Sequence, residues 1–73
     1  MARRRRNTGS YIVSGPNVDR RAPSHLEGVS LAQTYAGRLE KPGTVYVRDL
    51  FGRTLTRVDL SEDHCIYTTR VAS

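Results

Sequence analysis

The fold of this chain is constrained most strongly by one helix-forming segment with a proline on either side of it. Residues 24–27 fit a capping box, with Ser24 as the N-cap and Glu27 three positions later. Pro23 blocks an N-terminal extension, and Pro42 ends the helix just after Lys41. Within these limits apolar side chains recur every three or four residues: Leu26, Val29, Ala32, Ala36 and Leu39. This spacing predicts one amphipathic helix, whose apolar face needs a partner layer.

Residues that favour strands dominate four other segments, 10–14, 44–47, 53–60 and 64–71. Asp49 and Gly52 suit the first and last positions of a type I turn, so the second and third of these segments are expected to form a hairpin. Residues 15–23 contain two prolines and an Arg pair and are predicted to form a loop. The first strand is expected at an edge of the sheet.

The predicted order is β-α-β-β-β, which gives a two-layer α+β domain with one amphipathic helix packed on a small, mainly antiparallel sheet. Val45 and Val47 are expected to face the helix, because Arg48 lies on the same side of its strand as Tyr46. On the later strands, we group Leu55, Cys65 and Tyr67 with Val45 and Val47, on the face toward the helix. We group Val58 and Ile66 with Tyr46, on the opposite face.

The positive charge is concentrated at the start of the chain. The 73 residues include 12 Lys and Arg and 7 Asp and Glu, a net charge of +5. Four of the basic residues are Arg3, Arg4, Arg5 and Arg6, and without them eight basic and seven acidic side chains remain. The sequence therefore predicts a basic arm, residues 1–9, attached to a nearly neutral domain, residues 10–73.

We expect this arm to bind anions, and nucleic acid above all. Each arginine that reaches a phosphate displaces a condensed counterion, so affinity would fall steeply with salt. Arg20 and Arg21 form a second basic spot. The alternative is that residues 1–9 are a solubilising tail and that residues 15–23 are a solvated linker.

The tip of the predicted hairpin carries two large apolar residues, Leu50 and Phe51. They either fold back onto the helix end and complete a thin core, or anchor a partner protein. Exposed apolar clusters with a charged rim are typical of interfaces. Arg48, Arg53 and Arg57 would supply that rim.

Four tyrosines, three of them on predicted strands, offer another binding surface: Tyr11, Tyr35, Tyr46 and Tyr67. A sheet face that combines aromatic rings with arginine can stack bases. Their spacing fits no RNP motif, and tyrosine also suits half-buried strands.

No residue pattern in the sequence indicates catalysis, a metal site or a cofactor. His64 and Cys65 are neighbours on a predicted strand, so they would point to opposite faces and could not act as a dyad. We expect Cys65 to be a small buried residue, and both His64 and His25 to be solvated. No pair has zinc-ligand spacing, no glycine-rich nucleotide motif is present, and one cysteine excludes an intramolecular disulfide. An enzyme is therefore not expected.

No apolar run is long enough for a membrane span or a signal peptide, so the expected location is cytoplasmic, with no membrane partner. Residues 41–59, KPGTVYVRDLFGRTLTRVD, resemble a segment of small uncharacterised proteins of actinobacteria and their phages. The resemblance implies a high-GC origin, and a host-cytoplasm location if the gene is phage-borne. It implies no activity.

The expected function is that of a small basic binding module that associates with nucleic acid through Arg3–Arg6, helped by Arg20 and Arg21. The alternative is a phage-type accessory or virion protein that docks on a host or structural protein through its hairpin tip or an open strand edge. A homodimer formed through an edge strand is a third possibility.

Overall fold

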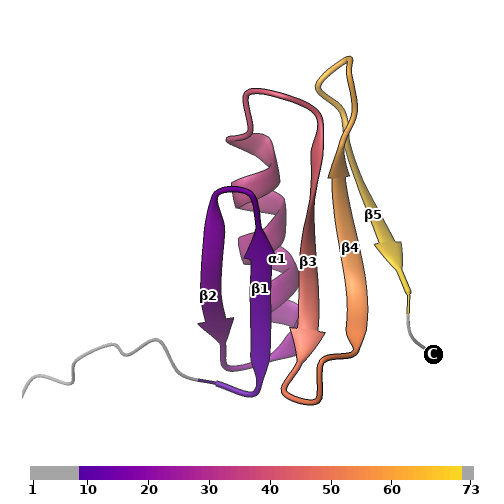
Figure 1. The fold of residues 1–73 in the computed structure, drawn as a ribbon. Coiled ribbons are helices and arrows are strands. Elements are labelled where there is room, and N and C mark those ends of the chain that lie inside the picture. Colours follow the sequence, from indigo (N-terminus) through magenta and orange to yellow (C-terminus); the bar gives the residue numbers. More distant parts are fainter. Residues whose placement is uncertain (1–8, 72–73) are drawn as a thin grey trace, which may run out of the picture.

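The computed structural model describes residues 9–71, which form a two-layer α+β domain (Figure 1). The elements in chain order are β1 (Tyr11–Gly15), β2 (Val18–Ala22), α1 (His25–Gly37), β3 (Gly43–Asp49), β4 (Thr54–Leu60) and β5 (Ile66–Arg70). The sheet order is β2-β1-β3-β4-β5, and every neighbouring pair is antiparallel. One helix packs on one face of this sheet, which confirms the predicted fold class.

The helix begins where the capping box predicts and ends earlier than expected. Ser24 is the N-cap, and its hydroxyl accepts a hydrogen bond from the Glu27 backbone N–H at 3.2 Å. The last helical residue is Gly37, and the Arg38 N–H bonds back to Tyr35, so Lys41 lies outside the helix. Leu26 is 80% exposed, so its predicted place on the buried face is wrong.

The buried stripe of the helix is made of small residues, Gly28, Ala32 and Ala36. These recur every four residues and bring the helix backbone close to the strands. A Cβ atom on Gly28 would lie 3.1 Å from Cγ1 of Val47. The glycine that weakens the helix by propensity therefore permits its close packing on the sheet.

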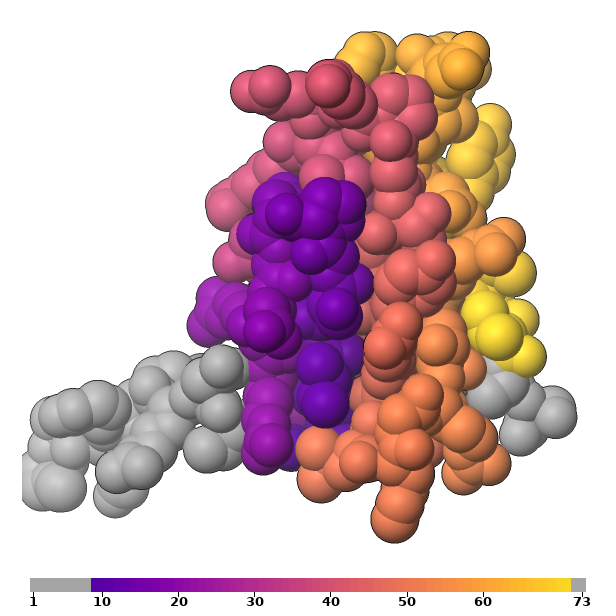
Figure 2. Space-filling model, in the orientation of Figure 1, coloured from indigo at the N-terminus to yellow at the C-terminus, as the bar shows by residue number. Residues whose placement is uncertain are grey.

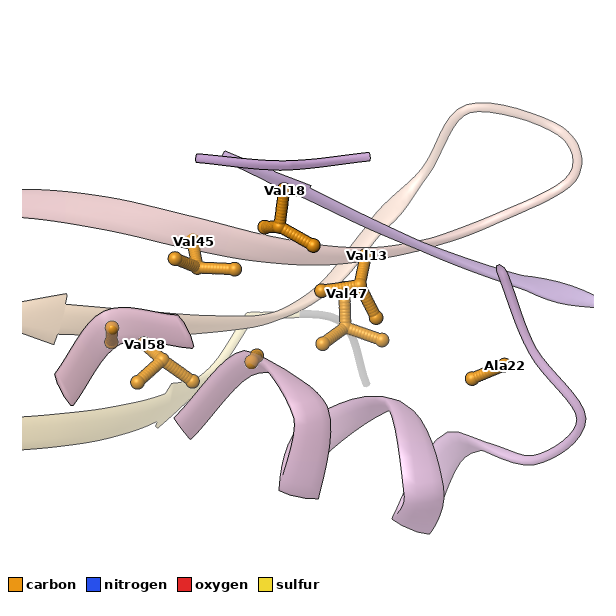
Figure 3. Close-up of a cluster of buried hydrophobic side chains, with 8 residues drawn as sticks. Val13, Val18, Ala22, Val45, Val47 and Val58 are labelled. Atoms are coloured by element: carbon orange, nitrogen blue, oxygen red, sulfur yellow. The ribbon is translucent and has the colours of Figure 1, made fainter. Parts of the chain in front are cut away.

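Four fully buried valines form the centre of the core: Val13, Val45, Val47 and Val58 (Figure 3). Val47 pairs with Val13 across one strand boundary, and Val45 pairs with Val58 across the next. The prediction that Val45 and Val47 face the helix is confirmed. Placing Val58 on the opposite face was wrong, because a residue shares its face with its direct cross-strand partner.

The segment predicted as a loop contains strand β2, so the observed order is β-β-α-β-β-β. Three of the five β2 residues are charged: Asp19, Arg20 and Arg21. This composition hides the strand from propensity reasoning but suits an edge strand. β2 takes the edge position, and β1, which was expected at an edge, lies between β2 and β3.

The turn between β3 and β4 has the chemistry that its sequence predicts. The Gly52 N–H bonds to the Asp49 carbonyl at 3.2 Å, and Gly52 has a φ of 90°. The Asp49 carboxylate accepts the backbone N–H groups of Phe51 and Arg53, both at 2.9 Å. These bonds fix the hairpin that ends in the exposed tip.

Candidate nucleic-acid interface

The sheet face opposite the helix is the main candidate surface. Side chains alternate along each strand, so the neighbours of the buried valines point away from α1. Figures 1 and 2 view the molecule from this side, with the helix behind the strands. We call this surface the open face; its central side chains are Ile12, Tyr46, Arg48, Leu55, Arg57, Asp59 and Tyr67.

The strand register fixes how the aromatic and basic groups are spaced. Tyr46 of β3 lies between Ser14 of β1 and Arg57 of β4. Tyr67 of β5 pairs with Asp59 of β4. Strand spacing and rise separate the two tyrosines by roughly 12 Å, with Arg57 beside Tyr46 and Asp59 beside Tyr67 on the intervening strand β4. The open face therefore offers two aromatic side chains, separated by a strand that carries the Arg57–Asp59 ion pair.

Arg48 and Tyr46 form one unit on the open face. The guanidinium carbon of Arg48 lies 5.2 Å from the centre of the Tyr46 ring, within the range of a cation–π contact. The Nε of Arg48 is buried and has no hydrogen-bond partner in the described part of the chain. The contact with Tyr46 thus places the Arg48 guanidinium over an aromatic ring of the open face, while its Nε is turned inward.

Arg57 is tied to the one acidic group of the central open face. Its Nε lies 3.2 Å from Oδ2 of Asp59, and Oδ1 of Asp59 accepts the Thr44 hydroxyl at 2.5 Å. The Arg57 side chain is about half exposed, so this ion pair is partly screened by water. The carboxylate is therefore held by its neighbours, while part of the guanidinium still faces solvent.

The two arginines of β2 point to opposite sides of the sheet. Arg20 pairs with the buried Val13, and its Nη1 donates to the Tyr35 hydroxyl at 3.3 Å on the helix side. Arg21 pairs with Ile12 and belongs to the open face. The expected second basic spot is therefore divided between two surfaces.

The predicted phosphate-binding residues Arg3, Arg4, Arg5 and Arg6 lie outside the described residues. The described chain starts at Gly9, which packs against the backbone of Ala22 and Pro23 at the end of β2. The arm is thus joined to the domain beside the edge strand that carries Arg21.

The hairpin tip stands away from the core. Phe51 is 90% exposed and Leu50 is 50% exposed, so they do not complete the core against the helix. Arg53 lies beside them and forms an ion pair with Asp49 at 3.3 Å. Arg48 stacks on Tyr46 instead of joining a rim around the tip.

The histidines and the cysteine are placed differently from their predicted positions. His25 is partly buried and its Nε2 lies 2.8 Å from the Thr56 hydroxyl, so it is not the solvated residue we expected. Cys65 is exposed and not the small buried residue we expected; it directly precedes β5, an edge strand whose five residues are all exposed. His64 is exposed as predicted and has a φ of 65°.

Residues 9–71 contain no group of three or more His, Cys, Asp or Glu side chains that could hold a metal ion.

An open hollow of about 480 Å³ lies at the end of the domain away from the hairpin tip, lined by Pro16, Asn17 and residues 38–42. Histidine and cysteine are both absent from that lining. Within residues 9–71, no helix is long and apolar enough to cross a membrane.

The sequence could have indicated the open face more strongly. Tyr46 and Arg48 are two residues apart on a predicted strand, so they share a side, and Val45 and Val47 mark the other side as buried. What the sequence lacked was the register that places Arg57 beside Tyr46 and Asp59 beside Tyr67. Searches of family models, curated proteins and solved structures gave no match to this chain.

Proposed function

We propose that this chain is a non-enzymatic module that binds single-stranded nucleic acid, with bases stacked on the open face and phosphates held by the arginines of the arm. The observation that carries the proposal is the uncovered sheet face with Tyr46, Arg48, Arg57 and Tyr67. Sheet-based binders use such platforms, because every base has a π-face that an aromatic ring or a guanidinium can cover.

Tyr67 is the more accessible of the two platforms. It is 55% exposed on the edge strand β5. The Tyr46 ring is partly covered by Arg48, so at this point the guanidinium plane is the surface that meets a base. A strand of nucleic acid that crosses the sheet from β3 to β5 would contact both platforms and pass Arg57.

The arm can reach this surface by chain length alone. An extended chain spans at most about 3.5 Å per residue, so the three residue steps from Gly9 to Arg6 allow a reach of about 10 Å, and the six from Gly9 to Arg3 allow about 20 Å. Gly9 packs beside the end of β2, whose Arg21 is on the open face. The arm therefore supports backbone contacts next to the stacking surface.

Fluorescence anisotropy with a labelled oligothymidine, at two salt concentrations, tests the proposal. Stacking on an aromatic side chain contributes about 1–3 kcal/mol per base, so Tyr67→Ala should weaken binding roughly tenfold or more. Tyr67→Phe retains the ring and is the matched control. Replacing Arg3–Arg6 by alanine should flatten the log–log salt dependence by about 3, as four phosphate contacts on a single strand require.

Two results would contradict this function. Equal affinity of wild type and Tyr67→Ala for the oligothymidine would show that bases do not stack on Tyr67 of the open face. Binding that prefers duplex over single strands would assign the affinity to the arm alone, because a base within a duplex cannot stack on the sheet.

The exposed tip favours a second candidate, docking on a protein, as an accessory or virion protein of phage type would do. The hairpin between β3 and β4 lies at the lower end of the molecule in Figure 1, where the helix also begins. Its tip residues Leu50 and Phe51 are exposed, as is Leu26 in the first turn of the helix. Val71 bonds to Leu55 and is half exposed at this same end. Exposed apolar side chains from three segments thus lie at one end of the domain, and exposed apolar surface is typical of a partner anchor.

A quantitative pull-down distinguishes this candidate from the first. Phe51→Ala removes the most exposed apolar side chain of the tip and leaves the open face intact. If proteins retained by the wild type are lost with Phe51→Ala but kept with Tyr67→Ala, the tip is the anchor. Equal recovery with Phe51→Ala and wild type would end this candidate.

A further inference from the structure

The two edges of the sheet are protected to different degrees. Three of the five residues of β2 are charged, which hinders pairing with another strand. The other edge strand, β5, has the sequence Ile-Tyr-Thr-Thr-Arg, and Arg70 is its only charged residue. All five residues of β5 are exposed. The β5 edge is therefore the less protected of the two.

Two backbone hydrogen bonds that flank β5 show which of its groups face outward. The Ser61 N–H donates to Cys65, and the Val71 N–H donates to Leu55, both at 2.9 Å. Bonded and non-bonded pairs alternate in an antiparallel ladder, so Tyr67 and Thr69 also bond to β4. The backbone groups of the residues between them face away from β4: Ile66, Thr68 and Arg70.

We propose that two copies of this chain associate through β5, antiparallel, with a two-fold axis at Thr68. The outward-facing residues are spaced symmetrically about Thr68, so they fit a second copy of themselves. Thr68 would exchange both backbone bonds with Thr68 of the other copy, and Ile66 with Arg70 of the other copy. The joined sheet would then end on both sides at β2, whose charges oppose further growth.

Charge complementarity also selects a second copy as the occupant. In the antiparallel arrangement, Arg70 of one copy lies beside the start of β5 in the other copy. Glu62 and Asp63 lie in the turn four and three residues before Ile66, the first residue of β5. Residues 9–71 contain eight basic and seven acidic side chains, so two domains do not repel each other strongly.

The association does not depend on the proposed nucleic-acid function. Tyr67 and Thr69 bond to β4 through their backbones, and their side chains lie on the open face beside the axis. Pairing would therefore join two open faces into one continuous surface without covering either. Because only one short strand from each copy takes part, the interface falls in the small, weak class.

Light scattering of the full chain, without nucleic acid, tests the proposal. We expect the mass of the wild type to approach twice the 8.2 kDa of the monomer as concentration rises to about 1 mM. Thr68→Pro removes an outward N–H and leaves the bonds to β4 in place, so it should stay monomeric and folded. Thr68→Val loses the same Gln33–Thr68 side-chain bond but keeps the N–H, and it should dimerise.

Amide exchange and a second variant keep the test independent of folding defects. The amides of Ile66, Thr68 and Arg70 should gain protection with concentration, whereas those of Tyr67 and Thr69 should be protected at all concentrations. Thr68→Lys places like charges face to face and should also be monomeric. A wild type that is monomeric at about 1 mM, or a Thr68→Pro variant with the wild-type mass, would overturn the proposal.

Discussion

The imidazole of His25 is hydrogen-bonded to the hydroxyl of Thr56, with 2.8 Å between Nε2 and Oγ1. Thr56 is the buried polar residue of the core, only 3% exposed, and belongs to β4. The ring of Tyr11 stacks on the same imidazole, with 5.8 Å between ring centres. The first turn of the helix is thus joined to both β4 and β1 by one histidine.

Thr56→Val should destabilise the domain by about 1–2 kcal/mol, because a part-buried histidine nitrogen loses its partner while the packed volume is nearly conserved. In a domain of this size that corresponds to a melting temperature roughly 5–15 °C lower. Thermal denaturation by circular dichroism measures the effect. Thr69→Val, on the exposed strand β5, is the control and should stay within about 0.5 kcal/mol. Equal melting of wild type and Thr56→Val would show that the bond does not stabilise the fold.

The elements that the sequence predicted well are those with strong local signals. The N-cap at Ser24 and the turn from Asp49 to Gly52 are determined by neighbouring residues, and both are confirmed. β2 has no such signal, since Asp19, Arg20 and Arg21 favour solvent. It forms because its backbone pairs with β1, an interaction that composition does not reveal.

The candidate surfaces could be predicted only in part. The alternation around Tyr46 placed Arg48 away from the core, which is correct, but cross-strand neighbours depend on register. For that reason Val58 was assigned to the wrong face. Cys65 was expected to be buried, but it adjoins the edge strand β5, whose residues are all exposed, and the order of strands in the sheet cannot be read from composition.

Substitutions at two helix glycines should have opposite effects. Alanine at Gly37 would meet only Cδ1 of Ile66 at 3.5 Å, so Gly37→Ala should stabilise by up to about 1 kcal/mol through helix propensity. Valine at Gly28 would press against Val47 and should destabilise by about 2 kcal/mol. Urea denaturation measures both variants. If Gly28→Val unfolds at the wild-type urea concentration, the helix does not lie as close to the sheet as Gly28 requires.

Truncation of the exposed tip should leave stability intact, in contrast to truncation of the core. Phe51→Ala should change the free energy of unfolding by no more than about 0.5 kcal/mol, because the side chain is 90% exposed. Val47→Ala, at a fully buried position, should cost about 2–3 kcal/mol. The same urea experiment compares them. A large loss with Phe51→Ala would mean that the tip packs on the domain and is not free to anchor a partner.

The hairpin turn should weaken in acid through Asp49. The backbone N–H of Arg53, followed by that of Phe51 and the Arg53 side chain, holds the pKa of this carboxylate below its ordinary value. A lowered pKa in the folded state means that the stabilisation is fully present above the ordinary aspartate pKa. It is then lost as the pH falls through the lowered value.

An NMR titration from about pH 6 to about pH 2 should therefore show the amide signals of Phe51 and Arg53 moving together below the usual range for aspartate. Asp49→Asn should abolish this transition and serves as the control. Added salt should shift the transition little, because the leading cause is a short-range hydrogen bond and not a long-range Coulomb interaction. A midpoint at or above the ordinary aspartate value would show that the carboxylate does not accept these bonds in solution.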